Sequence, residues 1–548
     1  MVFIPPGEKV IETRICRLSK KEFVITDKDA LLLEKMSPVI AGQVFPLPFP
    51  TLHPDLRMAR KLAFRNEMKL YKRQCDATKQ PIISIYSADK NYVVYNQKLW
   101  WSDDWDPCSF GQEYSFEKTF FEQYDTLMHR VPLLGSTVIN SENSEYCNDT
   151  GESKNCYLCL RTHESQDCLY SYRANKSEKC NDCHQVKESG FLYECFQCES
   201  CQRGMFLYNC ITCSDSSFLM NCRNCKDCFM CFGLEGKQYY ILGKEYTKEV
   251  YKEKIKEYEN WTDEKLKSAK NYFFSEVRKL HTLDIVNVDS EDCIGDGLLR
   301  CQSCVGVFAM KDSKGCRYSW DNISFTDSMD NYSAKKSELC YETTASKGGY
   351  RTHFCVRARD CPDCMYCLSC YGCKNCFGCV SLRNRSYCIL NKQYTQKDYE
   401  ELLPKILAHM TTTKEWGEFF PFSISTFGYN ETIAQEYFPH TEASVKIVGG
   451  KWHQEESITY TGPVYTPLDI LQYHEKYVSP EIAQKNIDAC LKGVLVCEIT
   501  KKPFNIVRQE LAFYIENKLS LPRICPEQRH KERIVFQKPR NLERLMKN

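Results

Sequence analysis

The chain has 548 residues, a formal net charge of +1 and 35 cysteines. At roughly 100–200 residues per domain, this length predicts about three or four domains, so a small scaffold held by disulfides is not needed to explain the cysteines. The near-zero charge excludes an overall electrostatic attraction to nucleic acid or anionic membranes, although a local basic face is compatible with it.

The N-terminal sequence predicts no secretory signal. The stretch MVFIPPGEKVIETRICRLSKKEF lacks a basic segment followed by an apolar core of about 7–15 residues. No apolar run of about 18 residues occurs, which predicts that the chain does not span a membrane. We therefore expect an intracellular protein. In a reducing compartment, clustered cysteines are more often metal ligands or buried thiols than disulfides.

The two ends of the chain resemble each other. Cys16 and Phe23, followed by a basic segment after His53, are matched by Cys497 and Phe504, followed by a basic segment after Cys525. At helical spacing, the basic residues would line one face and could bind phosphate groups. The candidates are Arg57, Lys61, Arg65, Lys69, Arg529, Arg533 and Arg540. Such a face is more often solvated or paired with acidic neighbours.

A tryptophan-rich segment follows the first basic segment. Trp100, Trp101 and Trp105 lie beside three aspartates within 100–106. They could form a binding surface or a carboxylate site, but aromatic residues at this density are more often core, with the acids in a turn.

The cysteines are concentrated in two blocks. Fifteen lie between Cys147 and Cys231 and fourteen between Cys293 and Cys388. The ends of the blocks match at a constant offset of 148 residues, so that Cys228 and Cys231 correspond to Cys376 and Cys379. The blocks are therefore copies of one unit. The charged segment between them, 247–283, contains no glycine or proline and predicts a helical connector, and Thr395 predicts the start of another helix.

Within each block, cysteines recur at intervals of 12 or 15 residues. In the first block the recurring positions are Cys156 and Cys159, Cys168 and Ser171, Cys180 and Cys183, Cys195 and Cys198, Cys210 and Cys213, and Cys222 and Cys225. Such a repeat is too short for helical-hairpin solenoids, which need about 33–47 residues, but suits one turn of a β-helix. We therefore predict β-solenoids in which repeated residues stack about 4.8 Å apart.

Cysteines three residues apart around a turn are typical of half a tetrahedral zinc site. Two neighbouring pairs would complete a structural site of four thiolates. The candidate ligands are Cys180, Cys183, Cys195, Cys198, Cys210, Cys213, Cys222 and Cys225, with His184 as a substitute. The alternative is a column of reduced cysteines packed as small apolar side chains, which the serines at 171 and 328 favour. Disulfides or iron–sulfur clusters are further alternatives.

Several features together resemble a known family. Segments 100–106, 427–432 and 436–439, the two cysteine blocks and the duplicated ends are similar to large cysteine-rich proteins of unassigned function, found as predicted proteins of small-genome bacteria and large DNA viruses. The resemblance covers nearly the whole chain. Some members carry a CoA-transferase label, which no residue of this chain supports. The resemblance implies zinc-ribbon-like ends that here have lost their second ligands, and it implies a cytoplasmic or virion-associated location.

We thus predict a mainly β fold with helical connectors, in which two cysteine-laddered β-solenoid blocks are flanked by degenerate zinc-ribbon-like α+β modules. The predicted regions are a ribbon-like module with the tryptophan-rich segment (1–135), block 1 (136–246), the helical connector (247–283), block 2 (284–394), a helix with an irregular linker (395–489) and a C-terminal ribbon-like module (490–548).

No sequence motif indicates catalysis. The chain lacks the nucleophile-elbow, P-loop, HExxH and dinucleotide-binding motifs. The leading hypothesis is a non-enzymatic scaffold, with structural zinc as its only expected cofactor, that binds a macromolecular partner or forms part of an assembly such as a virion. The first alternative is a protein that binds nucleic acid or the ribosome through its basic terminal segments. The second is an enzyme of unknown chemistry.

Overall fold

The computed structural model describes residues 2–67, 69–144, 146–180, 190–192, 217–220, 222, 224–258, 261–277, 279, 285–455, 460, 462–535 and 538–546. The chain forms two compact units. Unit 1 contains Met1–Ser136, Leu283–Gln454 and Pro539–Asn548, and unit 2 contains Thr137–Thr282 and Glu455–Lys538. Each unit thus combines one cysteine-rich block with the terminal module from the opposite end of the sequence.

Unit 1 begins with a hairpin that leads into a capped helix. Strands β1 (Val10–Ile15) and β2 (Glu22–Thr26) pair antiparallel, and Thr26 caps α1 (Asp27–Met36) through a reciprocal hydrogen-bond pair with Asp29. The segment continues with β3 (Val39–Ile40), β4 (Gln43–Val44), α2 (Pro54–Leu62), β5 (Tyr71–Gln74), β6 (Pro81–Ser84), β7 (Val94–Tyr95), α3 (Gln97–Trp101), η1 (Pro107–Phe110), α4 (Phe120–Arg130) and β8 (Leu133–Leu134).

Block 2 and its C-terminal helices complete unit 1. The strands of the block are β17 (Asn287–Val288), β18 (Ile294–Asp296), β19 (Leu298–Leu299), β20 (Val305–Phe308), β21 (Ile323–Thr326), β22 (Lys335–Glu338), β23 (Cys388–Ile389) and β24 (Lys392–Gln393). They are followed by α7 (Gln396–Thr412), η3 (Phe422–Ile424), η4 (Tyr429–Glu431), α8 (Ile433–Tyr437), α9 (Glu442–Ile447) and α13 (Leu542–Leu545). The predicted helix start at Thr395 is confirmed, because the Thr395 hydroxyl accepts the Asp398 backbone N–H at 3.1 Å.

Unit 2 contains block 1, the connector and the C-terminal module. Block 1 has β9 (Val138–Ile139), β10 (Thr150–Gly151), β11 (Glu178–Cys180), β12 (Gly190–Leu192), β13 (Ser217–Met220), β14 (Lys226–Phe232), β15 (Gln238–Ile241) and β16 (Lys244–Glu245). The remaining elements are α5 (Lys248–Ile255), η2 (Lys256–Tyr258), α6 (Asp263–Val277), η5 (Ile470–Tyr473), α10 (Pro480–Lys492), β25 (Leu495–Val496), β26 (Pro503–Phe504), α11 (Arg508–Glu516) and α12 (Pro526–Ile534).

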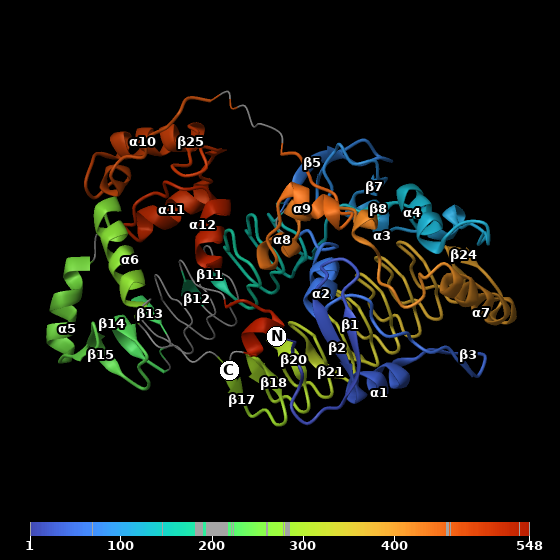
Figure 1. Cartoon of the computed structure of the whole chain (residues 1–548). Coiled ribbons are helices and arrows are strands. Elements are labelled where there is room, and N and C mark those ends of the chain that lie inside the picture. Colours follow the sequence, from blue (N-terminus) through green and yellow to red (C-terminus); the bar gives the residue numbers. More distant parts are fainter. Residues whose placement is uncertain are drawn as a thin grey trace. The chain divides into compact units, whose positions relative to one another are not determined.

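Most of block 2 is a ladder of single-residue bridges. From Leu299 onward, each bridge joins a residue to the one twelve positions later in parallel register, as Lys311 pairs with Ile323 and Arg317 with Met329. The residue after each bridge has a positive φ, such as 50° at Asp312. Asp, Asn and Gly tolerate this left-handed conformation best. The chain therefore turns a corner at every third residue, and the turns of block 2 follow one another from β18 to β24 (Figure 1).

The fold class predicted from the sequence, mainly β with two β-solenoid blocks, is wrong. Among the described residues there are thirteen α-helices and only sheets of two to four strands, so the fold is mixed α/β without a solenoid or a closed sheet. The corners at every third residue explain the difference, because extended runs of about two residues are too short to build long stacked strands. The twelve-residue spacing seen in the sequence does occur in the structure, because bridged residues are twelve positions apart.

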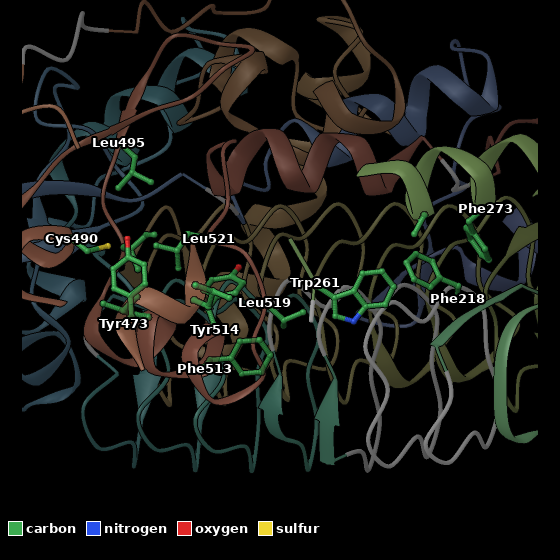
Figure 2. Packing of buried hydrophobic residues seen from close by; sticks show 14 of the residues in the cluster. Phe218, Trp261, Phe273, Tyr473, Cys490, Leu495, Phe513, Tyr514, Leu519 and Leu521 are labelled. Carbon is green, nitrogen blue, oxygen red and sulfur yellow. The ribbon is translucent and has the colours of Figure 1, made fainter. Parts of the chain in front are cut away.

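The core of unit 2 is aromatic where the connector meets block 1. Phe218 lies 5.8 Å from Trp261 and 5.4 Å from Phe273 between ring centroids (Figure 2). The same cluster continues to Tyr514 and Cys490 in the C-terminal module. The interior of the second half of block 2 is different, since the buried cluster within 355–388 consists mainly of thiols. Among the described residues, no helix is long and apolar enough to cross a membrane.

Candidate functional site

The predicted zinc ligands are described only in part. Cys222 and Cys225 are buried, and their thiols donate hydrogen bonds to the carbonyls of Cys231 and Leu234, each at 3.4 Å. Cys180 ends β11. The other candidates, Cys183, Cys195, Cys198, Cys210 and Cys213, lie outside the described residues, as does His184. Within the described part of the chain, no group of three or more His, Cys, Asp or Glu side chains is arranged to hold a metal ion.

The described thiols satisfy inward-facing backbone groups of the ladder. The Cys355 thiol donates to the His353 carbonyl at 3.2 Å and accepts the backbone N–H of Cys367 at 3.3 Å. Ser328 makes the same two contacts with its hydroxyl, to the Thr326 carbonyl and from the Cys340 N–H, at 2.8 and 3.0 Å. Serine therefore replaces cysteine in the ladder because both side chains are small and both donate and accept.

The N-terminal basic candidates are paired within unit 1. Arg57 and Lys61 in α2 are at most 1% exposed. The Arg57 Nε lies 2.6 Å from Asp330 of block 2, and the Lys61 Nζ lies 3.6 Å from the same carboxylate. Arg65 is also buried and donates to Glu67 at 2.9 Å. These three cations bind carboxylates of the same unit and do not form an exposed face. Lys69 is half-buried.

The C-terminal basic candidates are buried as well. Arg529, Arg533 and Arg540 are between 4% and 8% exposed. Arg540 lies 2.9 Å from Asp321 in unit 1, with its guanidinium 5.4 Å from the Tyr437 ring. The basic face predicted from the two ends is thus turned into the protein, where opposite charges offset the cost of burial.

Arg529 belongs to a docking triad that joins the C-terminal module to block 1. Its guanidinium lies 4.9 Å from the centroid of the Tyr170 ring and 3.2 Å from the Glu510 carboxylate. The Tyr170 hydroxyl donates to the same carboxylate at 2.6 Å. A tyrosine of the ladder is therefore held between an arginine and an acid of the module.

Unit 1 contains a matching docking triad. The Arg57 guanidinium lies 5.4 Å from the Tyr318 ring, and the Tyr318 hydroxyl lies 3.4 Å from an Asp29 oxygen. Tyr318 follows Tyr170 by the block offset of 148, and Asp29 precedes Glu510 by 481, the same offset that relates Cys16 to Cys497. Residues of both duplications thus meet at this contact, although in unit 1 the arginine pairs with Asp330 and Asp29 pairs with Arg317.

The tryptophan-rich segment packs on the last turns of block 2. The Arg383 guanidinium lies 5.4 Å from Trp100 and 5.2 Å from Trp105, and its Nη2 donates to the Ser102 carbonyl at 2.9 Å. Burial lowers the pKa of Arg383. Trp100 is fully buried, whereas Trp101 is 39% exposed beside Tyr371. This segment is mainly core, with one tryptophan at the surface.

The exposed cations of block 2 form a column along the ladder. The bridges connect Lys311 to Ile323, Ile323 to Lys335, Lys335 to Lys347 and Lys347 to Arg359, then continue to Tyr371 and Arg383. We call Lys311, Lys335, Lys347 and Arg359 the cationic column. Lys335 and Lys347 are exposed, and Lys311 and Arg359 are half-buried. No carboxylate occurs at any of the seven bridged positions. The column is therefore a positive stripe on the surface of unit 1.

The spacing of these cations in the sequence is a signal for this column. Lys311, Lys335, Lys347 and Arg359 are separated by multiples of twelve residues. The corresponding bridged positions of block 1, Gly151, His163 and Asn175, include no lysine or arginine. The counterparts of Lys335, Lys347 and Arg359 in block 1 lie outside the described residues. Only the bridge register shows that the column lies on an open side of the turns.

Two other groups of ionisable residues have structural roles. A hollow of about 480 Å³ lies beside the start of α7 and is lined in part by Thr395 and Asp398, which cap that helix. Elsewhere in unit 1, the Glu431 carboxylate accepts hydrogen bonds from Lys90 and from Tyr71, both at 2.6 Å. Burial lowers the pKa of Lys90, against the attraction of Glu431.

No protein-family model matches the sequence, and no curated protein matches it.

Proposed function

We propose that the protein is a non-enzymatic scaffold that presents the open sides of its ladders to a macromolecular partner or within a larger assembly. The docking triads carry the proposal, because in each unit a tyrosine of the ladder contacts an arginine and an acid of the terminal module. Two copies of one contact indicate that holding a terminal module on a ladder is the architectural task of the chain.

The distribution of charge supports this proposal. Arg57 and Arg529 are buried against carboxylates, while Lys335 and Lys347 stay at the surface of block 2. The buried pairs hold each module in one geometry, and one side of block 2 remains accessible. A rigid body with an extended charged side is suited to binding a large partner, since many weak contacts act together along it.

A photo-crosslinking residue placed at Lys347 tests the scaffold proposal. In protein recovered from its native source, we expect covalent products with a macromolecule from position 347. The matched control is Lys397, which is 84% exposed on α7 and should give far fewer products. Absence of products from Lys347, together with thermal stabilisation of the protein by a small metabolite, would contradict the scaffold and favour an enzyme.

Structural zinc in block 1 remains part of the proposal. It rests on the cysteine pairs, such as Cys222 and Cys225, that recur through that block. Metal analysis of natively purified protein, combined with thiol titration, tests it. We expect at least two zinc ions per chain, lost with unfolding on chelation. No metal, together with 35 titratable thiols, would contradict it.

A further inference from the structure

We infer that the free edge of β1 pairs with the same edge of a second copy of the chain, in an antiparallel arrangement centred on Thr13. Strand β1 belongs to a sheet of two strands, and within the described part of the chain only β2 pairs with it. Thr13 is exposed, and Ile15 is 70% exposed. This edge lies on the N-terminal module and not on the ladders, so the pairing goes beyond the proposed scaffold function and can fail without it.

The C-terminal module contains the equivalent edge. By the offset of 481 that relates Cys16 to Cys497, Val494 is the counterpart of Thr13. The two hairpins also share one register, because β25 pairs with β26 at positions that match the pairing of β1 with β2. The backbone groups of Thr13 therefore face away from their hairpin, as those of Val494 do.

In the C-terminal module this edge is covered by the chain itself. The Val494 N–H donates to the Pro463 carbonyl at 3.0 Å, and its carbonyl accepts the Tyr465 N–H at 2.8 Å. Val464 is thereby bridged to Val494 in parallel register. The backbone of Thr13 has no such added segment among the described residues. The same edge thus accepts an added strand in one module and is open in the other.

The sequence of β1 is complementary to itself about Thr13. In an antiparallel pair centred on this residue, Glu12 of one copy lies opposite Arg14 of the other, and Ile11 lies opposite Ile15. Opposite charges and apolar β-branched residues are both favourable cross-strand pairs. Ile11 is 51% exposed, so the pairing also removes apolar surface from water. Because the pattern is the same in both copies, a two-fold axis closes the contact.

The charged residues of β1 are held in place for this pairing. The Arg14 Nε lies 2.8 Å from Glu12 of the same chain, and Arg14 also donates to the Phe49 carbonyl at 3.0 Å. In the paired strands, the charges of the two copies alternate in sign on one face. Edge strands that avoid association commonly carry lysine or proline, and β1 contains neither. Its bulge lies between Val10 and Glu12, away from the centre.

Sedimentation velocity of the full chain over a series of concentrations measures the self-association. Ile15→Lys places a charge opposite Ile11 of the second copy and should raise the Kd of the dimer at least about tenfold, because the change occurs twice in each dimer. The matched control is Ile447→Lys, the same change at a side chain of α9 that is 80% exposed. This control should leave the Kd unchanged.

Charge reversal tests the register of the pairing. Glu12→Arg and Arg14→Glu each place like charges opposite each other in a homodimer, and each should weaken self-association. An equimolar mixture restores opposite charges at both positions, so a heterodimer should form with a Kd within about threefold of the natural one. Thermal unfolding verifies that each variant is folded. Ile15→Lys keeps the test valid if Arg14→Glu is unstable.

Hydrogen exchange locates the contact on the chain. Peptides from β1 should exchange more slowly as the concentration of the natural chain rises, because the second copy covers the backbone groups of Thr13. Peptides around Val494 should exchange at the same rate at every concentration, because their own chain covers that edge.

Four outcomes would overturn the inference. They are a chain that stays monomeric at every concentration, equal weakening by the two isoleucine variants, no heterodimer in a mixture of folded charge variants, and a strand of another protein crosslinked at position 13 of a monomeric chain. The last would make the edge a docking site for a different partner. Crosslinking from Lys347 does not depend on any of these results, so the scaffold proposal is tested separately.

Discussion

At the scale of single residues, many inward positions of block 2 carry a small side chain that both donates and accepts a hydrogen bond, whereas others, such as Phe325 and Ala358, carry apolar ones. The Cys355 thiol donates to a carbonyl two residues earlier and accepts an N–H twelve residues later. Burial raises the pKa of the Cys340 thiol to about 12, which keeps it protonated and able to donate at neutral pH. Cysteine side chains in block 2 thus form hydrogen bonds directly with backbone groups.

Substitutions of Cys355 distinguish how much the hydrogen bonds of its side chain and how much its volume contribute to stability. Cys355→Ser should change the free energy of unfolding by less than about 1 kcal/mol, because the hydroxyl can still accept the Cys367 N–H. Cys355→Ala leaves that buried N–H without an acceptor and should cost about 1–3 kcal/mol. Urea unfolding measures both. A serine variant as unstable as the alanine variant would show that sulfur itself, as a metal ligand or a packing group, is needed.

Buried His353 makes stability depend on pH. Its side chain is fully buried, and burial, followed by the Arg351 charge, lowers the pKa of His353 to about 3. In the unfolded chain the pKa is about 6.5, so between these values only the unfolded state binds the proton. Stability is therefore lost as the pH falls from about 6.5 toward 3.

His353→Leu removes this proton uptake. Relative to the variant, the natural chain should lose about 1.4 kcal/mol per pH unit between about pH 6 and pH 4. Urea unfolding at a series of pH values, performed on both proteins, gives the difference. Parallel curves for the two proteins would show that His353 is protonated in the folded state as readily as in the unfolded state.

At the scale of elements, helices of unit 1 are held together by their ends. Glu415 follows α7, and its carboxylate accepts the N–H groups of Phe120 and Phe121, at 2.9 and 2.7 Å, at the start of α4. These donors have no partner within the helix, and a negative charge there also interacts favourably with the helix dipole. A contact between residues almost 300 positions apart therefore fixes where α4 begins.

Replacement of this carboxylate should loosen α4. Glu415→Ala is expected to cost about 1–3 kcal/mol, because two partly buried N–H groups lose their acceptor. Glu401→Ala, which removes an exposed carboxylate of α7 near Lys397, is the control and should cost at most about 0.5 kcal/mol. Hydrogen exchange of peptides from α4 distinguishes them. Equal exchange in the two variants would refute this role of Glu415.

At the scale of the whole molecule, the chain is a pair of related units with exchanged ends. The module at the N-terminus docks on block 2, and the module at the C-terminus docks on block 1. The docking triads use Tyr318 with Asp29 and Tyr170 with Glu510, which occupy equivalent positions of the duplication. A contact retained in both copies is the one on which the architecture of each unit depends.

Arg529→Ala tests the importance of the docking triad in unit 2. Removal of Arg529 leaves the buried Glu510 without its cation, which should cost about 3–5 kcal/mol. Lys531→Ala, on an exposed site of the same helix, should cost less than about 1 kcal/mol. Hydrogen exchange should rise in α11 and α12 and stay unchanged in unit 1. Exchange that rises equally in both units would contradict a local role.

Features that depend on neighbours along the chain can be predicted from the amino-acid sequence. The twelve-residue spacing, the match between the blocks and the helix start at Thr395 follow from local patterns, because corners and caps are made by residues a few positions apart. The fold class was wrong because corner residues such as Asp312 limit strand length, and no periodicity of cysteine reveals them.

Which cations are accessible to solvent depends on the tertiary structure. Arg57 and Lys347 are both basic residues at regular spacing, yet Arg57 meets Asp330, 273 positions away, while Lys347 stays at the surface. The burial of a charge depends on a partner that folding brings near, and the cost of desolvation makes that partner decisive. Exposed cations such as Lys347 therefore lie on block 2, whereas the candidates at the two ends, such as Arg57 and Arg529, are buried.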